Sequence, residues 1–259
     1  MVRSRESRLQ RATLPGRIDS DQSVRRKDKS MNKKLTALAI CLAMSAPVMF
    51  AQEKEDERLA NSAKVLQEIL GEGKGLSTNI LNHAVCVLIF PSVKKVALGI
   101  TGSSYGRGAL VCRKGAEMNG EWGAPAMYSL DQHSLGVQLG GSATDFVLVV
   151  MNQKGADQIL NGKFKVGTGA DAVAGPTGAQ ATQYDAQAMN QDILTYSRSK
   201  GALVGVSLQG AKMDTDNDAN KALYGKEVSA KEIVTGSDQP PAGAKALIVL
   251  LDKTSPARK

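Results

Sequence analysis

The spacing of apolar residues predicts one long helix followed by a series of short strands. Residues 55–70 place apolar side chains at helical spacing with charged side chains opposite, and the glycines that follow are expected to end the helix. From residue 84 onward, short apolar runs are separated by Gly, Pro or Asn, which is typical of strands. The predicted strands are Ala84–Phe90, Val96–Ile100, Ala109–Arg113, Ala126–Leu130, Leu135–Leu139, Asp145–Met151, Ala181–Tyr184, Ile193–Arg198 and Ala202–Leu208.

The spacing between these runs predicts how the strands pair. Gaps of about ten to fifteen residues leave no room for crossover helices, so we expect antiparallel pairing. A helical turn is predicted at Ala156–Leu160, and helices at Asp218–Tyr224 and Lys231–Thr235, with a further helical or extended piece at Ala244–Leu251. The fold class is therefore α+β: a single domain over residues 55–253, with a mainly antiparallel or barrel-like sheet, an N-terminal amphipathic helix and C-terminal helices.

The N-terminal segment has a different pattern. Residues 31–51 carry two lysines, an apolar stretch of about ten residues and small residues before Ala51, which predicts a cleaved signal peptide rather than a retained anchor. Residues 1–30 are Arg-rich, polar and aperiodic, so we expect a disordered extension that reflects a start codon assigned too early. The mature chain is then expected to be exported to the periplasm or cell envelope.

The basic charge of the chain is concentrated in that segment. Residues 1–51 hold 11 Lys and Arg against 4 Asp and Glu, which supplies seven of the formal net charge of +8. The body is nearly neutral, so a general attraction to nucleic acid is not expected. The two cysteines of the body, Cys86 and Cys112, both lie in apolar runs, and a disulfide between them is permitted by export but not required by the sequence.

The glycine-rich stretch Lys165–Ala179 contains a G-x-G-x-x-A pattern that resembles a dinucleotide-binding loop. The expected helix is too short, because Gly175-Pro176 stops it, and no acidic residue ends a following strand at the ribose distance. We therefore expect no cofactor and interpret the stretch as a tight backbone turn. Its structural residues are Gly167, Gly169, Gly175, Pro176 and Gly178.

Other patterns that could carry chemistry are incomplete. Asp214, Asp216 and Asp218 have calcium-loop spacing, but the glycine and the final glutamate of such a loop are missing, so capping of a helix is the favoured interpretation. His83, Cys86, Cys112 and His133 do not form a zinc-binding pattern, and Ser207 misses the nucleophile motif by one position. No metal site is expected, and the protein is predicted not to be an enzyme.

Basic residues at predicted turns and strand ends are the remaining candidates. If they converge, they form a cationic rim able to hold lipid phosphates; the alternative is an ordinary solvated surface. The predicted lipid-binding residues are Lys94, Lys95, Arg107, Arg198 and Lys200.

The order of several phrases makes the chain similar to a known family. These phrases are LIFPSVKK, YGRGALVCR, EWGAPAMYSL, GTGADAVAGPTG, TYSRSKGALVGVSLQG and NKALYG. Together they resemble the SYLF domain family from about Leu59 to Leu251, and the predicted export suggests a bacterial member.

The resemblance implies a module that binds lipids and has no enzymatic activity. For an exported protein the implied partner is an anionic phospholipid or another membrane lipid, and the actin association of fungal members is not expected to transfer. An envelope protein-interaction or structural module is the alternative, and a hydrolase is a further one.

Overall fold

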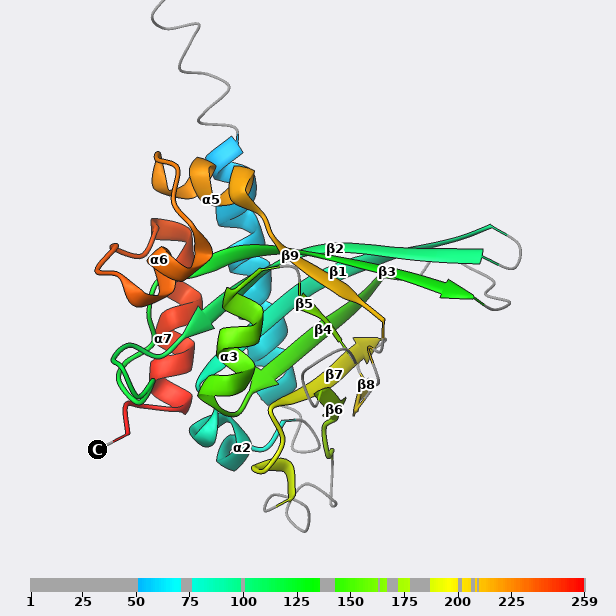
Figure 1. Cartoon of the computed structure of the whole chain (residues 1–259), viewed down its shortest axis with the longest axis horizontal. Coiled ribbons are helices and arrows are strands. Elements are labelled where there is room, and N and C mark those ends of the chain that lie inside the picture. The colour runs from blue at the N-terminus through cyan, green and yellow to red at the C-terminus, as the bar shows by residue number, and fades with distance from the viewer. Residues whose placement is uncertain are drawn as a thin grey trace, which may run out of the picture. The chain divides into compact units, whose positions relative to one another are not determined.

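Figure 1 shows the computed structural model of the chain. The structure describes residues 51–70, 76–98, 101–135, 143–162, 164–166, 172–177, 187–199, 202–205, 208 and 210–258. All of them lie in one compact unit, Val48–Lys259. The predicted N-terminal extension, and the predicted signal peptide apart from Ala51, lie outside the described ranges.

A large curved sheet organises this unit (Figure 1). Its strand order is β5-β9-β3-β2-β1-β4-β7-β6, and β8 pairs separately with β7. All described pairings are antiparallel except that of β6 with β7. The strands are β1 (Cys86–Leu98), β2 (Thr101–Cys112), β3 (Ala126–Leu135), β4 (Ala143–Val150), β5 (Phe164–Lys165), β6 (Ala172–Ala174), β7 (Ile193–Ser199), β8 (Ala202–Gly205) and β9 (Lys212–Thr215).

Helices cover both faces of the sheet. Because side chains alternate along a strand, each central strand sends apolar residues to both sides. One side, for example Leu88 of β1, packs in a cluster with residues of α3 (Gln153–Leu160) and α6 (Ala230–Thr235). The other side, for example Ile89, packs with the N-terminal helix (residues 51–70), α2 (Thr78–His83) and α7 (Lys245–Thr254). We call this second side the helix-51–70 face.

The predicted fold class is confirmed: the unit is α+β, with a mainly antiparallel sheet, an N-terminal helix and C-terminal helices. The N-terminal helix buries its predicted apolar side in the core, since Leu59, Leu66 and Ile69 are all fully buried. The C-terminal elements are α5 (Asn217–Tyr224), α6, a short 3-10 turn at Ala242–Ala244, and α7.

The first two predicted strands are in fact one. Strand β1 runs through Pro91 and Ser92, where its register shifts against both neighbours, and Ser92 adopts a positive φ of 51°. The Pro-Ser pair therefore forms a bulge inside a strand, although Pro and Ser are also typical of turns. Likewise β3 continues past the predicted end at Leu130 to Leu135, because Asp131 and Gln132 keep its pairing with β2. Residues 136–139 of the next predicted strand lie outside the described ranges.

Sequence patterns missed the shortest elements. The helix α2 and the strands β5, β6 and β9 have too few residues to show periodicity. The strand β6, which lies inside the glycine-rich stretch just before Gly175, pairs parallel to β7. The strand predicted after that stretch, Ala181–Tyr184, lies outside the described ranges.

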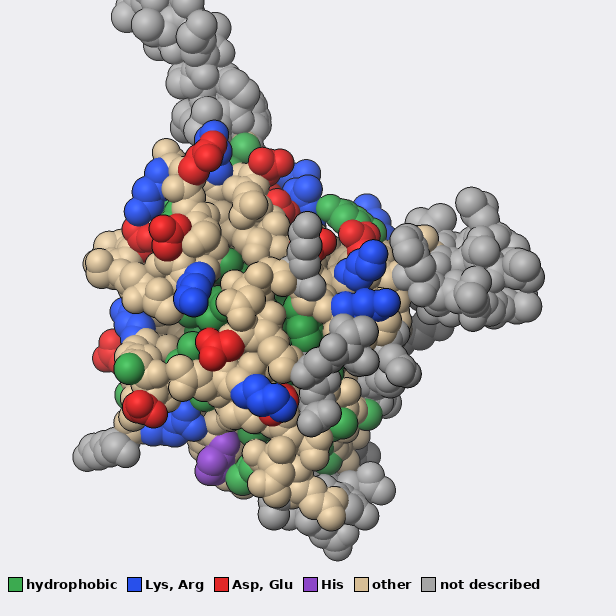
Figure 2. Space-filling model, in the orientation of Figure 1, with side chains coloured by type: hydrophobic (Ala, Val, Ile, Leu, Met, Phe, Trp, Pro, Cys, Tyr) green, Lys and Arg blue, Asp and Glu red, His purple; other side chains and the backbone are tan. Residues whose placement is uncertain are grey.

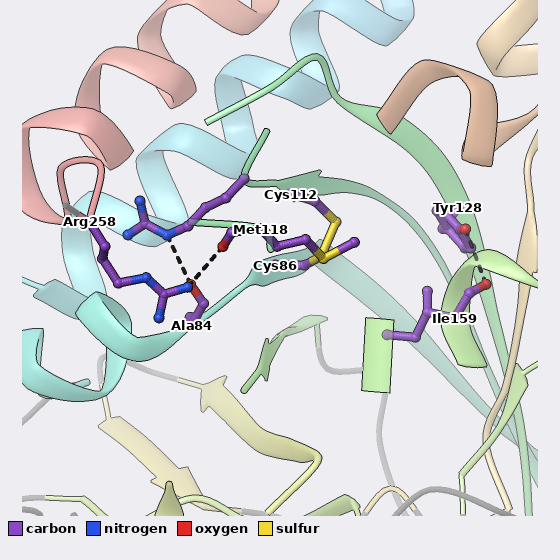
Figure 3. The surroundings of a disulfide bond; sticks show 8 residues. Ala84, Cys86, Cys112, Met118, Tyr128, Ile159 and Arg258 are labelled. Atoms are coloured by element: carbon purple, nitrogen blue, oxygen red, sulfur yellow. Dashed lines mark hydrogen bonds between the residues drawn. A yellow bond between two sulfur atoms is a disulfide. The ribbon is translucent and has the colours of Figure 1, made fainter. Parts of the chain in front are cut away.

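A disulfide joins Cys86 of β1 to Cys112 of β2, directly opposite each other in the sheet. Figure 3 shows the disulfide together with two hydrogen bonds in its surroundings. Arg258 donates to the Met118 carbonyl at 2.8 Å, and Tyr128 donates to the Ile159 carbonyl at 3.2 Å. Burial raises the pKa of Tyr128 to about 12. Both cysteines are fully buried, so the bond lies within the core.

Arg113, at the end of β2, holds two helix ends together. It is 1% exposed, and its guanidinium donates to the carbonyls of Ala84, Gly120, Ser255 and Pro256. Ala84 and Ser255 are the C-caps of α2 and α7, where backbone carbonyls are unpaired and favour positive charge. The ring of Trp122 covers the guanidinium carbon at 4.4 Å. Burial lowers the pKa of Arg113 to about 10, so it remains charged at neutral pH.

Candidate functional site: a polar sheet face around Arg107

The strand register brings three of the predicted lipid-binding residues onto one face. Alternation from Ala109 and Val111 places Arg107 of β2 on the helix-51–70 face, and alternation from Tyr196 places Arg198 of β7 there too. Lys94 follows the bulge and lies opposite Tyr105 on the same face. Arg107 and Arg198 stand three strands apart, which is about 14 Å across the sheet.

Arg107 lies in a polar pocket of about 330 Å³ at the start of α5. Its Nε–H donates to the Tyr105 hydroxyl at 2.8 Å and lies 3.2 Å from Asp216 Oδ2. The hydrogen bond with Tyr105 and the charge of Asp216 raise the pKa of Arg107 despite its partial burial. The pocket is lined by Tyr105, Arg107, Ser129, Thr215, Asp216, Asn217 and Asp218.

The pocket offers donors and acceptors side by side. Asp216 is the N-cap of α5 and accepts from the Ala219 amide with Oδ1, which leaves Oδ2 for Arg107. The outer nitrogens of Arg107 make no hydrogen bond within the described part of the chain, and the side chain is 35% exposed. Because a guanidinium presents a planar set of donors, it suits phosphate or carboxylate oxygens. The carboxylates of Asp216 and Asp218 suit hydroxyl or ammonium groups.

The second basic residue, Lys94, is exposed at the outer part of β1. No ion pair involving Lys94 occurs among the described side chains. Only the backbone of Lys95 is described, and Lys200 lies outside the described ranges. The prediction that these three lysines contact lipid stays a prediction.

Arg198 has a structural role whether or not it also binds a ligand. Its Nη1 lies 2.6 Å from Glu68 of the N-terminal helix and 3.3 Å from Asp145 of β4. Asp145 in turn accepts from the Ser92 amide at 2.8 Å, which holds the bulge of β1. Arg198 therefore ties the helix to the sheet, and its charge is matched by two carboxylates.

The glycine-rich stretch is only partly described. Gly175 is buried against the ring of Tyr196: a Cβ at position 175 would lie 2.0 Å from Tyr196 Cζ. This contact places Gly175 near the Arg198 end of the candidate site, while Lys165 lies on β5 at the opposite end of the sheet. Pro176 is half-buried, and Gly167, Gly169 and Gly178 lie outside the described ranges.

The other candidate groups are placed as follows. Cys86 and Cys112 form the disulfide with each other, so neither is available as a thiolate ligand for zinc. Asp216 caps α5 as predicted from the sequence, Asp218 lies in its first turn, and Asp214 belongs to β9. Among the described residues no three His, Cys, Asp or Glu side chains cluster as metal ligands. Ser207 and the side chain of His133 are outside the description.

Within the described ranges, no helix combines the length and the apolar character needed to span a bilayer.

Acidic and basic side chains are interspersed on the side of the molecule that Figure 2 shows. Figure 2 shows blue and red side chains mixed over the face in view rather than gathered into one patch. Sequence reasoning found Arg107 but missed Tyr105, which lies two residues earlier on the same face of β2. It named Asp216 as a helix cap but did not bring it to Arg107, because that approach depends on β9 pairing with β3. No local signal in the sequence reports that pairing.

Comparison with known proteins agrees with this architecture. A family model described as "Ysc84: Las17-binding protein actin regulator" matches residues 131–254. An SH3 domain-containing protein of Schizosaccharomyces pombe is 30% identical over 190 residues, which is 72% of this chain and 43% of the relative. The chain belongs to the Ysc84 (SYLF) family.

Two further relatives show how much of each protein is shared. LAS seventeen-binding protein 3 of Saccharomyces cerevisiae is 25% identical over 78% of this chain and 44% of its own length. The human SH3 domain-containing YSC84-like protein 1 is 24% identical over 81% of this chain and 61% of its own length. The chain therefore spans less than half of the two yeast relatives.

The Ysc84 phrases recognised in the sequence include residues with structural roles. In NKALYG, Asn220 is fully buried and accepts from the Met127 amide at 2.7 Å, so its side chain continues the pairing of β3 beyond β9. Tyr224 donates to the Pro125 carbonyl at 2.7 Å, and Gly225 ends α5 with a left-handed φ of 67°. In EWGAP, Trp122 donates to the Ser255 carbonyl at 2.9 Å. These contacts explain why the phrases accompany the fold.

Proposed function

We propose that this Ysc84-family protein is a non-enzymatic lipid-binding protein that recognises anionic headgroups at a membrane surface. The observation that carries the proposal is the placement of Lys94 and Arg107 on one sheet face, with Arg107 open to solvent in a polar pocket. The family resemblance supports lipids as the class of ligand.

The pocket favours a particular kind of headgroup. Arg107 can pair with a phosphate, while Asp216 and Asp218 stand within the same pocket. A bare phosphate would be repelled by these carboxylates, whereas hydroxyl groups would be bound by them. We therefore expect a phosphate that carries a hydroxylated headgroup, such as phosphatidylglycerol, to bind more tightly than phosphatidic acid.

Vesicle co-sedimentation tests the proposal. We expect Lys94→Ala/Lys95→Ala/Lys200→Ala to weaken binding to phosphatidylglycerol vesicles by an order of magnitude or more, at about 1 kcal/mol for each lysine near the surface. Arg198 is left intact because its loss would also release the N-terminal helix from the sheet.

The matched control removes three lysines elsewhere. Lys64, Lys114 and Lys231 are all exposed and lie on different elements. Binding that is equally strong to uncharged vesicles, or equally weakened by Lys64→Ala/Lys114→Ala/Lys231→Ala, would reject recognition by the proposed residues.

A protein-binding module is the second candidate. The family description, matched at residues 131–254, and the Saccharomyces cerevisiae relative, matched over 78% of this chain, both name Las17 as a binding partner. Failure to bind any vesicle, together with saturable binding of actin filaments in a pelleting assay, would favour this candidate.

We also propose that the chain is exported after removal of residues 1–51. The support is the apolar stretch that precedes Ala51. Expression of the whole reading frame in a bacterium, followed by mass measurement of the periplasmic protein, is expected to give a chain that starts at Gln52. A cytoplasmic chain that keeps its N-terminus would contradict the proposal.

A further inference from the structure

The outward side of α7 carries an apolar surface flanked by lysines. Three large hydrophobic side chains are exposed in the described part of the chain: Tyr105, Val173 and Val249. Val249 is the most exposed, at 56%. Lys245 and Lys253 lie one helical turn before and after it, and both are exposed.

A shallow apolar hollow lies beside this side of the helix. Its volume is about 280 Å³, and it is lined by Pro240, Pro241, Ala242, Lys245, Ile248 and Val249. The adjacent Pro-Pro segment lacks backbone N–H groups at both positions, so the apolar area is extended without adding donors. The hollow is separate from the pocket around Arg107, since the two share no lining residue.

The acidic groups nearby are turned to other partners. Asp252 accepts from the Trp122 amide at 3.1 Å, and Asp56 accepts from the Gly243 amide at 3.2 Å. Lys245 and Lys253 form no ion pair within the described ranges. This side of α7 therefore presents Val249 between two exposed lysines, while the carboxylates of Asp252 and Asp56 face backbone amides of other segments.

We infer that this side of α7 docks on an anionic bilayer, with Val249 inserted among the lipids and Lys245 and Lys253 at the level of the phosphates. Helices that lie in the membrane interface bury an apolar side and extend lysines toward the headgroups. The N-terminal helix is not available for this contact, because Leu59, Leu66 and Ile69 are fully buried. The inference rests on the proposed lipid-binding function but assigns the bilayer contact to a different surface.

A tryptophan reporter tests the contact directly. The native chain has one tryptophan, Trp122, which is 1% exposed and so is shielded from lipid. In Val249→Trp, vesicles of phosphatidylglycerol with brominated acyl chains are expected to quench the added emission about twofold and to shift it to shorter wavelength. The matched control is Val173→Trp on β6, at a position 38% exposed, where we expect no quenching.

A charge variant tests the role of the lysines. Lys245→Gln/Lys253→Gln is expected to raise the vesicle dissociation constant about thirtyfold, while Lys114→Gln/Lys231→Gln leaves it within about twofold. The whole chain serves in both experiments. The reporter at residue 249 is local and does not respond to lipid contact by residues 31–51, and the charge variants are compared with a control variant that carries the same residues 31–51.

Each outcome separates the inference from the proposed function. Sedimentation with vesicles but no quenching at residue 249, or equal quenching at residues 173 and 249, overturns the inference and leaves the proposed function standing. Quenching that is as strong on phosphatidylcholine alone overturns the role of the lysines. Concentration-dependent self-association that Val249→Asp abolishes assigns the surface to a second copy and also overturns the inference. No binding of any variant overturns both proposals.

Discussion

At the scale of single residues, Gly175 shows a glycine that is required by a neighbour rather than by its own backbone angles. Tyr196 occupies the space that any side chain at position 175 would need. Tyr196 is itself fully buried on the helix-51–70 face, so its ring cannot move aside without disturbing the core.

We therefore expect Gly175→Ala to lower the free energy of unfolding by about 1–3 kcal/mol, the usual cost of overpacking. Urea denaturation followed by circular dichroism measures it. Ala174→Ser, at an exposed neighbouring position, is the control and is expected to change stability by less than about 0.5 kcal/mol. Equal stability of the two variants would show that the Tyr196 ring can shift.

Arg113 gives the second prediction at this scale. Arg113→Met keeps most of the volume but leaves the carbonyls of Ala84, Gly120 and Pro256 without the donor they have in the native chain. We expect a loss of about 3–5 kcal/mol in the free energy of unfolding. Lys114→Met changes the next residue, which is exposed, and should be nearly neutral. A mild effect of Arg113→Met would mean that water replaces the guanidinium.

At the scale of elements, helix ends are defined by local side chains. The helix α6 begins with a capping box, in which Ser229 accepts from the Glu232 amide and Glu232 accepts from the Ser229 amide at 2.9 Å. The hydrogen bonds from the Ser229 backbone and hydroxyl hold the pKa of Glu232 below its ordinary value of 4.5.

This capping box predicts a pH dependence for α6. Because the folded pKa of Glu232 is lowered, its contribution to helix stability is present above the unfolded pKa and is lost as the pH falls through the folded value. Carboxyl NMR titration is expected to give a Glu232 pKa below 4.5, and Ser229→Ala should move it back toward 4.5. A pKa unaffected by Ser229→Ala would exclude the Ser229 hydroxyl as a cause and leave the backbone amide of residue 229, which the substitution retains.

At the scale of the whole molecule, the disulfide constrains the unfolded chain. The cysteines are separated by 26 residues, so loop closure is worth about 3.5 kcal/mol in the chain-entropy model. Cys86→Ala/Cys112→Ala is expected to lose about that much stability in urea, whereas Cys41→Ala should not. Unchanged stability of native protein on full reduction would contradict this account.

The sequence alone specified much of the architecture. Helical spacing identified the N-terminal helix, and apolar runs identified most of the central strands, because period and strand length are local properties. The turn-forming residues Pro91 and Ser92 led to the wrong prediction of a break between two strands. Pairing with β2 and β4 on both sides of this point keeps the chain in one strand, β1. The shortest strands left no local signal at all.

For the candidate site, the sequence determined which residues carry charge and which motifs mark the family. Only the tertiary structure decided which of these charged side chains remain accessible to a ligand. Arg198 is matched by Glu68 and Asp145 from two other elements, while Arg107 keeps its outer nitrogens exposed beside Asp216. The reason is physical: burial and ion pairing depend on residues far apart in the chain, and their approach is set by strand register and helix docking.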